Sequence, residues 1–146
     1  MKQGDAPIVV SQEFENGRDV VWLAITEVDQ MRQWFFENIP AFEARVGFKT
    51  QFNVHNEGRD FMHLWEIVEV RPGTRIVYDW RYANLPGEGS VVFELSEQDD
   101  RILLTLTNTI LENFPQDMAE FTDEACRGGW SYFINDRLKT YLAGLG

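Results

Sequence analysis

The sequence is poor in cysteine and histidine, and it has no long apolar run. Its 146 residues include one cysteine, Cys126, and two histidines, His55 and His63. A single thiol cannot form an internal disulfide, and two histidines without nearby cysteines supply fewer ligands than a zinc site needs. No apolar stretch approaches the roughly 20 residues that span a bilayer. We therefore expect no disulfide, no metal, no cofactor and no membrane-spanning helix.

Positive charge is also scarce, and we expect no secretory signal. The chain carries 13 Lys and Arg against 24 Asp and Glu, a formal net charge of -11. Nucleic acids and anionic membranes attract basic surfaces, so neither is an expected partner. The first ten residues, MKQGDAPIVV, reach a charge before any long apolar stretch. Together with the single cysteine, this predicts a reducing, cytoplasmic location.

Aromatic residues, by contrast, are abundant. Five Trp, four Tyr and eleven Phe make up 14% of the chain, and hydrophobic residues make up 44%. So many rings in a small protein indicate either a bulky core or a lined cavity. The length suits one domain with its own core, and we predict a single domain over residues 1–146.

The last quarter, residues 116–142, is the only long segment with helical periodicity. Its apolar residues recur at spacings of three and four, at Trp130, Phe133, Ile134, Leu138 and Tyr141. We expect this helix to begin near Pro115, since proline suits a first helical turn. Gly128 and Gly129 interrupt it, at a cost of about 1 kcal/mol each relative to alanine. The glycine pair predicts either close packing on a sheet or room left opposite bulky rings.

The upstream pattern indicates one strand, two short helices and then five or six strands. Residues 8–14 have strand character, and helices are expected over 16–25 and 27–36. After Pro40 the strands are separated by short turns, which favours an antiparallel meander. The predicted α+β fold is a curved antiparallel sheet with the long helix across its concave face.

One strand indicates which side of the sheet is concave. Residues 75–82, RIVYDWRY, alternate between two faces. The face that we expect beneath the helix carries Ile76, Tyr78, Trp80 and Tyr82. The opposite face, with Asp79 and Arg81, is expected to meet solvent.

Several strings of the sequence match a known family. They are DVVWLAITEVDQMRQWF with Trp22 and Trp34, MHLWEIVEVRPGTRIVYDWRY, the strand pair from Phe93 to Thr107, and Gly129-Trp130 followed by Leu138, Tyr141 and Leu142. They resemble the helix-grip (START-like, SRPBCC) superfamily, in particular homologues of the activator of ninety-kilodalton heat-shock protein ATPase. The resemblance spans nearly the whole chain and departs from the family at Met62-His63, where glycine is usual.

The resemblance implies a helix-grip fold, in which the sheet wraps around the C-terminal helix and two short helices follow the first strand. Members of the superfamily commonly enclose an apolar cavity between sheet and helix and bind lipids, sterols or polyketide-like molecules. Some members are cyclases or hydrolases. Members of the co-chaperone branch stimulate an ATPase in trans.

We expect a non-enzymatic binding protein, monomer or homodimer, that holds a small apolar ligand, lipid- or aromatic-like, between sheet and helix. The candidate binding residues are His63, Trp65, Tyr78, Trp80, Tyr82, Phe93, Trp130 and Phe133. Alternatively, these side chains fill an ordinary core that has no cavity.

Two other functions stay open. The first is a co-chaperone-like module that stimulates a chaperone ATPase in a stress response. The second is a cyclase or hydrolase that uses a pocket carboxylate, for which Glu66 is the candidate. We favour a structural role for Glu66, in an ion pair with Arg81, over a catalytic role. Cys126, in mid-helix, is expected to be an inert buried thiol, and the chain has no G-x-S-x-G nucleophile motif.

Overall fold

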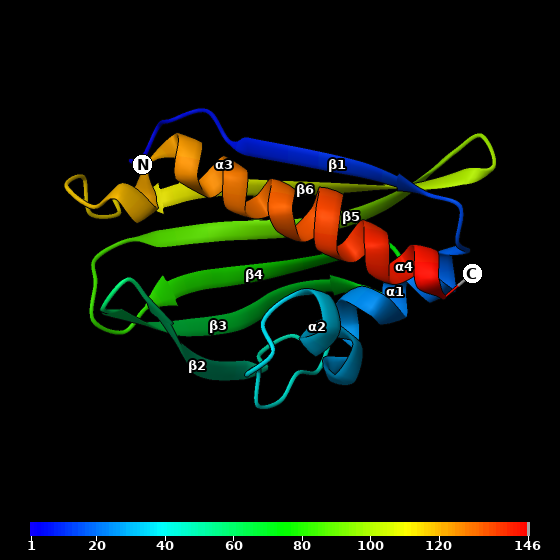
Figure 1. Cartoon of the computed structure of the whole chain (residues 1–146), viewed down its shortest axis with the longest axis horizontal. Coiled ribbons are helices and arrows are strands. Elements are labelled where there is room, and N and C mark those ends of the chain that lie inside the picture. Colours follow the sequence, from blue (N-terminus) through cyan, green and yellow to red (C-terminus); the bar gives the residue numbers. More distant parts are fainter. Residues whose placement is uncertain (146) are drawn as a thin grey trace.

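The computed structural model describes residues 1–145, which form one six-stranded antiparallel sheet with a long helix across one face (Figure 1). The strands are β1 (Ile8–Phe14), β2 (Lys49–Asn56), β3 (Arg59–Arg71), β4 (Arg75–Tyr82), β5 (Glu88–Gln98) and β6 (Arg101–Glu112). Their order in the sheet is β1-β6-β5-β4-β3-β2. Strands β2 to β6 are therefore a meander, and β1 joins it beside the last strand. The predicted α+β helix-grip fold is confirmed.

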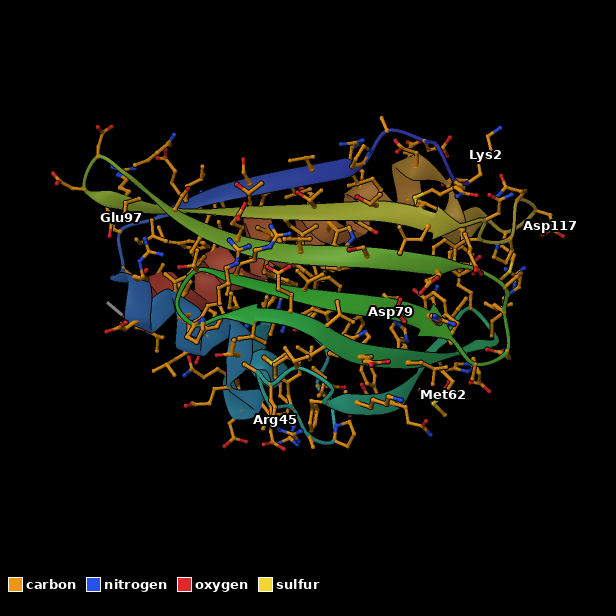
Figure 2. All side chains as sticks on the ribbon, turned by 180° about the vertical axis from the view of Figure 1, so that it is seen from behind. Lys2, Arg45, Met62, Asp79, Glu97 and Asp117 are labelled. Atoms are coloured by element: carbon orange, nitrogen blue, oxygen red, sulfur yellow. The ribbon has the colours of Figure 1, made fainter. Side chains whose placement is uncertain are left out.

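Alternation along the strands separates a concave, buried face from a convex, wetter one. In β3, Phe61, His63 and Trp65 are buried, whereas Met62 and Leu64 between them are half-buried. In β4 the buried side chains include Ile76, Tyr78 and Trp80, as the alternation predicts. Figure 2 shows the convex face from behind, where Asp79 lies on the side away from the helix. The predicted concave face is confirmed.

The C-terminal helix runs from Asp123 to Gly144 and contains a wider turn. It consists of α3 (Asp123–Ser131), a π-helical segment η2 (Tyr132–Leu138) and α4 (Lys139–Gly144). Ile134, Leu138 and Leu142 are fully buried against the sheet. The predicted apolar stripe is therefore the face that packs on the core.

The helix begins later than we expected from Pro115. Thr122 is its N-cap, and the threonine side chain accepts a hydrogen bond from the backbone N–H of Ala125 at 3.1 Å. The preceding segment contains a short 3₁₀ helix, η1 (Ala119–Phe121). The rings of Phe114 and Phe121 stack at 5.3 Å, which holds this segment against the end of the sheet instead of extending the helix.

Polar contacts fix the helix on both of its flanks. Asn135 donates to the backbone oxygen of Ser11 at 2.8 Å and to the side chain of Gln12 at 3.0 Å. On the other flank, the hydroxyl of Tyr141 donates to the side chain of Gln30 at 3.0 Å. The helix therefore has a defined position between β1 and the short helices.

Those short helices are α1 (Arg18–Thr26) and α2 (Val28–Trp34), close to the predicted ranges. The indole N–H of Trp34 donates to the backbone oxygen of Ala24 at 2.7 Å and joins the two helices. The strands that we expected directly after Pro40 begin only at Lys49, because residues 40–48 form an irregular connection. The chain leaves α2 at Phe35, which is buried in the core.

Candidate ligand pocket

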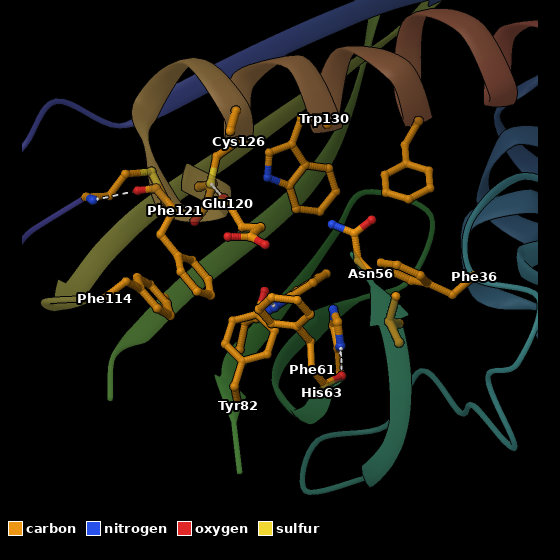
Figure 3. Close-up of a pocket in the computed structure, with 18 of the residues that line it drawn as sticks. Phe36, Asn56, Phe61, His63, Tyr82, Phe114, Glu120, Phe121, Cys126 and Trp130 are labelled. Atoms are coloured by element: carbon orange, nitrogen blue, oxygen red, sulfur yellow. Dashed lines mark hydrogen bonds between the residues drawn. The ribbon is translucent and has the colours of Figure 1, made fainter. Parts of the chain in front are cut away.

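A pocket of about 360 Å³ lies between the first part of α3 and the ends of β3 and β4 (Figure 3). Its wall is mainly aromatic, with rings from Phe36, Phe61, Trp80, Tyr82, Phe114, Phe121, Trp130 and Phe133. Phe61, Phe114 and Phe121 belong to a small hydrophobic cluster at the end of the sheet, apart from the main core. The pocket is the space where rings from these two clusters face each other.

Five of the eight candidate binding residues line this pocket: His63, Trp80, Tyr82, Trp130 and Phe133. Whether they bind a ligand stays a prediction. The other three, Trp65, Tyr78 and Phe93, do not line it and are at most 2% exposed in the core.

The reason for this difference is the ring of Phe35. It lies 5.5 Å from the ring of Trp65, 6.2 Å from that of Phe93 and 4.9 Å from that of Phe133. Phe35 thus fills the middle of the space between sheet and helix. The expectation that Trp65, Tyr78 and Phe93 line a cavity between sheet and helix is wrong, because the pocket on this side of the sheet lies beyond this ring, towards the start of α3.

Sequence reasoning missed the aromatic residues outside the regular elements. Phe36 follows α2, and Phe114 and Phe121 lie in or beside the irregular segment before α3. Phe114 lies between the last expected strand and the expected helix, and a solvated connection has no need of a large ring, so this residue is the signal that would have pointed to the cluster. Phe121 falls inside the segment expected to be helical, residues 116–142.

His63 is the buried polar side chain of the pocket, with 5% of its surface exposed. Its Nδ1 lies 2.9 Å from the backbone oxygen of Phe61. A carbonyl oxygen can only accept, so Nδ1 carries the hydrogen and Nε2 holds a free lone pair. Burial lowers the pKa of His63 to about 4, although the bond to Phe61 acts in the opposite direction. The ring is therefore neutral at pH 7.

Tyr82 stands beside His63 as its partner across the β3–β4 pair. The centroids of the two rings are 4.8 Å apart. The Tyr82 hydroxyl accepts a hydrogen bond from the indole N–H of Trp80 at 3.0 Å. Burial raises the pKa of Tyr82, so the hydroxyl keeps its hydrogen. The pocket therefore presents one acceptor nitrogen and one donor hydroxyl side by side.

The rim of the pocket carries charged groups that are already paired. Arg59, at the start of β3, donates to the Glu120 carboxylate of η1 at 2.8 Å. His55 lies 2.9 Å from the carboxylate of Asp60, and the hydrogen bond from His55 is the main cause that lowers the pKa of Asp60. Within residues 1–145, no group of three or more His, Cys, Asp or Glu side chains is placed to hold a metal ion.

Gly128 and Gly129 leave space, and neither is closely packed. A Cβ atom built on either glycine would have no other atom within 4 Å, apart from chain neighbours and the helix's own backbone. Close helix–sheet packing therefore does not explain the pair. Gly129 lines the pocket, whereas Gly128 is exposed to solvent.

Cys126 lines the pocket on the helix side, and it is half-buried. Its thiol lies 3.5 Å from the backbone oxygen of Glu120. Burial raises the pKa of Cys126 to about 11, so the thiolate is scarce at pH 7. This agrees with the expected inert thiol.

Glu66 is outside the pocket, and its expected ion pair with Arg81 is wrong. The strand register places Asp79 opposite Glu66 and places Leu64 opposite Arg81. Arg81 instead donates to Asp79 at 2.9 Å and to Glu88 at 2.6 Å. Glu66 lies on the convex face with Lys49 at 4.0 Å. Glu66 therefore cannot act as an acid in the pocket beneath α3.

Proteins of known structure share this fold. The DynU16 protein, from the dynemicin biosynthetic locus, superposes with a TM-score of 0.75 at 23% identity, over 95% of this chain and 48% of its own. This chain thus spans about half the length of DynU16. Protein CV1439 from Chromobacterium violaceum superposes with a TM-score of 0.74 at 20% identity, over 95% of both chains. For MLL2253 from Mesorhizobium loti the TM-score is 0.77 at 20% identity, over 97% of this chain and 99% of its own.

At these identities the similarity shows the fold alone. Among curated proteins, none matches the sequence. No helix in residues 1–145 is long and apolar enough to cross a membrane. The model of one family, described as activator of Hsp90 ATPase homolog 1-like protein, matches residues 17–143, and the chain therefore belongs to that family.

Proposed function

We propose that this protein binds, without catalysing a reaction, a small and mainly apolar ligand in the pocket between α3 and the ends of β3 and β4. The observation that carries the proposal is the pocket's aromatic wall around about 360 Å³ of space. Small-molecule sites typically measure about 300–1,000 Å³ and combine apolar walls with a few polar groups. That description fits this pocket, whose polar side chains include His63 and Tyr82.

The titratable side chains of the pocket favour binding over catalysis. His63, with a pKa of about 4, is a weak base at neutral pH, and Cys126, with a pKa of about 11, is a poor nucleophile. The carboxylate of Glu120 is held by Arg59. DynU16, which has the same fold, is a protein of a biosynthetic locus, and this supports an organic small molecule as the ligand class.

The pair of adjacent glycines offers a matched test. Leucine at Gly129 would extend into the pocket, whereas leucine at Gly128 would extend into solvent. The probe is N-phenyl-1-naphthylamine, an uncharged dye whose fluorescence rises in apolar surroundings. We expect the native protein to bind the dye, Gly129→Leu to weaken binding at least tenfold, and Gly128→Leu to leave it unchanged.

Thermal unfolding provides an independent readout. A ligand at a hundredfold excess over its Kd stabilises the native state by about 2.7 kcal/mol. The native protein and Gly128→Leu should both show this stabilisation with the dye, and Gly129→Leu should not. Absence of dye binding by the native protein, or equal weakening by both leucines, would contradict a ligand site in this pocket.

The family's description favours a second candidate, in which the chain stimulates the ATPase of a chaperone. The net charge of -11 would suit a basic surface on such a partner. The measurement is the ATPase rate of an Hsp90-class chaperone with and without this protein. A rate increase that persists in Gly129→Leu would assign this role to the outer surface. An unchanged rate at saturating protein argues against it.

A further inference from the structure

Two hydrogen-bonding atoms of the pocket can each form a further hydrogen bond. Within residues 1–145, Nε2 of His63 has no hydrogen-bond partner, and the Tyr82 hydroxyl has no acceptor for its own hydrogen. Both side chains line the pocket, and they lie opposite each other on β3 and β4. Figure 3 shows the His63 ring with one nitrogen bonded to Phe61 and the other directed into the cavity. These two atoms restrict which ligands fit.

His63 can only accept through the nitrogen that faces the cavity. The backbone oxygen of Phe61, 2.9 Å from Nδ1, demands a donor there, which leaves Nε2 without a hydrogen. The ring is enclosed by aromatic neighbours, with centroids 5.0 Å away for Phe36 and Phe52 and 5.5 Å for Trp80. A second proton on the ring would place a charge among these rings, which is costly. A ligand must therefore bring a donor.

Tyr82 has the complementary role. Its oxygen already accepts a hydrogen bond from the indole N–H of Trp80 at 3.0 Å, so the hydroxyl can still donate its own hydrogen to a ligand. A ligand group that meets both atoms must donate to His63 and accept from Tyr82. A hydroxyl group does both with one oxygen.

The pocket offers little positive charge to an anionic ligand. The amino group of Met1, which lines the pocket, already donates to the backbone oxygen of Phe121 at 2.7 Å. In the part of the chain that the structure describes, no lysine or arginine lines the pocket. Arg59 contacts the pocket residue Glu120, whose carboxylate already holds the guanidinium. With a net charge of -11, the whole molecule also repels anions. The charge balance therefore favours a hydroxyl group on an uncharged molecule over an anionic ligand.

We propose that the ligand is an uncharged aromatic molecule whose hydroxyl group donates to Nε2 of His63 and accepts from the hydroxyl of Tyr82. This inference rests on the proposed function, because it concerns the chemistry of the same pocket. The aromatic skeleton packs between the rings of Trp80, Trp130 and Phe133, which line the same space. The hydroxyl supplies the specificity.

Naphthalene, 1-naphthol and 1-naphthoate form a matched set of probes. They share one ring system and differ in having no polar group, a hydroxyl or a carboxylate. Each is measured by displacement of N-phenyl-1-naphthylamine. We expect 1-naphthol to bind about 10- to 100-fold more tightly than naphthalene, because naphthalene leaves the buried Nε2 unpaired. Naphthoate should bind more weakly than naphthol.

The variant His63→Phe keeps a ring in place and removes the acceptor. It should lose the preference for naphthol, so that naphthol and naphthalene bind with similar affinities. Glu66→Gln, on the convex face, is the control and should keep the preference. Nitrogen NMR of the native protein gives a readout that needs no variant. The Nε2 resonance of His63 should move on addition of naphthol, as expected for a nitrogen that accepts a hydrogen bond, and much less with naphthalene.

The outcomes separate the two proposals. Equal affinities for naphthalene and naphthol in the native protein would overturn the hydroxyl proposal and leave a general apolar site. Tight binding of naphthoate would overturn the requirement for an uncharged ligand. If the dye binds and none of the three displaces it, the hydroxyl proposal fails alone. If the dye itself does not bind, the proposed function fails as well.

Discussion

Acidification should destabilise the folded protein through His63. The buried ring has a pKa of about 4, against an ordinary value of 6.5, chiefly because burial disfavours its charged form. Between these two values the unfolded chain binds a proton and the folded chain does not. Stability rises with pH wherever the unfolded state binds more protons. His63 therefore costs no stability above pH 6.5, and its destabilising effect grows as the pH falls from 6.5 towards 4.

The size of the effect follows from the difference between the two pKa values. The free energy of unfolding falls by about 3 kcal/mol near pH 4, because a pKa difference of one unit corresponds to about 1.4 kcal/mol. Total stabilities of about 5–15 kcal/mol are typical, so such a loss is large. Asp79 acts in the opposite direction, because burial and Glu88 raise its pKa to about 6. It is partly exposed, and water screens much of its contribution.

The assay is urea unfolding, followed by tryptophan fluorescence from pH 4 to pH 8, of the native protein and of His63→Phe. Subtracting the two curves removes Asp79 and the other groups that both proteins share. The free energy of unfolding of the native protein should fall relative to the variant by about 3 kcal/mol between pH 7 and pH 4. A difference that stays constant over this range would refute a buried, neutral His63.

Substitutions at four further positions test the local geometry by thermal unfolding. Gly128→Ala and Gly129→Ala should each raise stability by about 0.5–1 kcal/mol, because neither added Cβ meets another atom within 4 Å and alanine favours helix; destabilisation would contradict the open space. Gly87→Ala should lower stability by about 2 kcal/mol or more, because φ is +118° and the added Cβ would overlap the ring of Phe114; a neutral result would refute that contact. Thr122→Ala should lower it by about 1 kcal/mol through loss of the N-cap, whereas Thr122→Ser should keep the cap.

The class of fold was predictable from the sequence because its signals are local. The alternation in residues 75–82 and the helical stripe through Ile134 and Leu138 identify which side chains face the core without reference to any distant residue. Short turns between the strands then leave the antiparallel meander as the simplest arrangement. Each of these inferences depends on neighbours a few residues apart.

The pocket was only partly predictable, because its limits depend on contacts between distant segments. Phe35 fills the middle of the space above Trp65, and no periodicity in either segment indicates this contact. Likewise, the β3–β4 register decides that Asp79, and not Arg81, lies opposite Glu66. A shift of one residue in this register would change the pairing without altering the pattern of either strand.

The sequence by itself therefore determined the curved sheet, the helix across it and the supply of aromatic rings. The tertiary structure alone decided which rings close the core and which face a space. It also decided the chemistry of His63, because the hydrogen on Nδ1 follows from the position of the Phe61 carbonyl. Hydrophobic patterning is set along the chain, whereas a cavity depends on how well side chains from distant segments fill a shared volume.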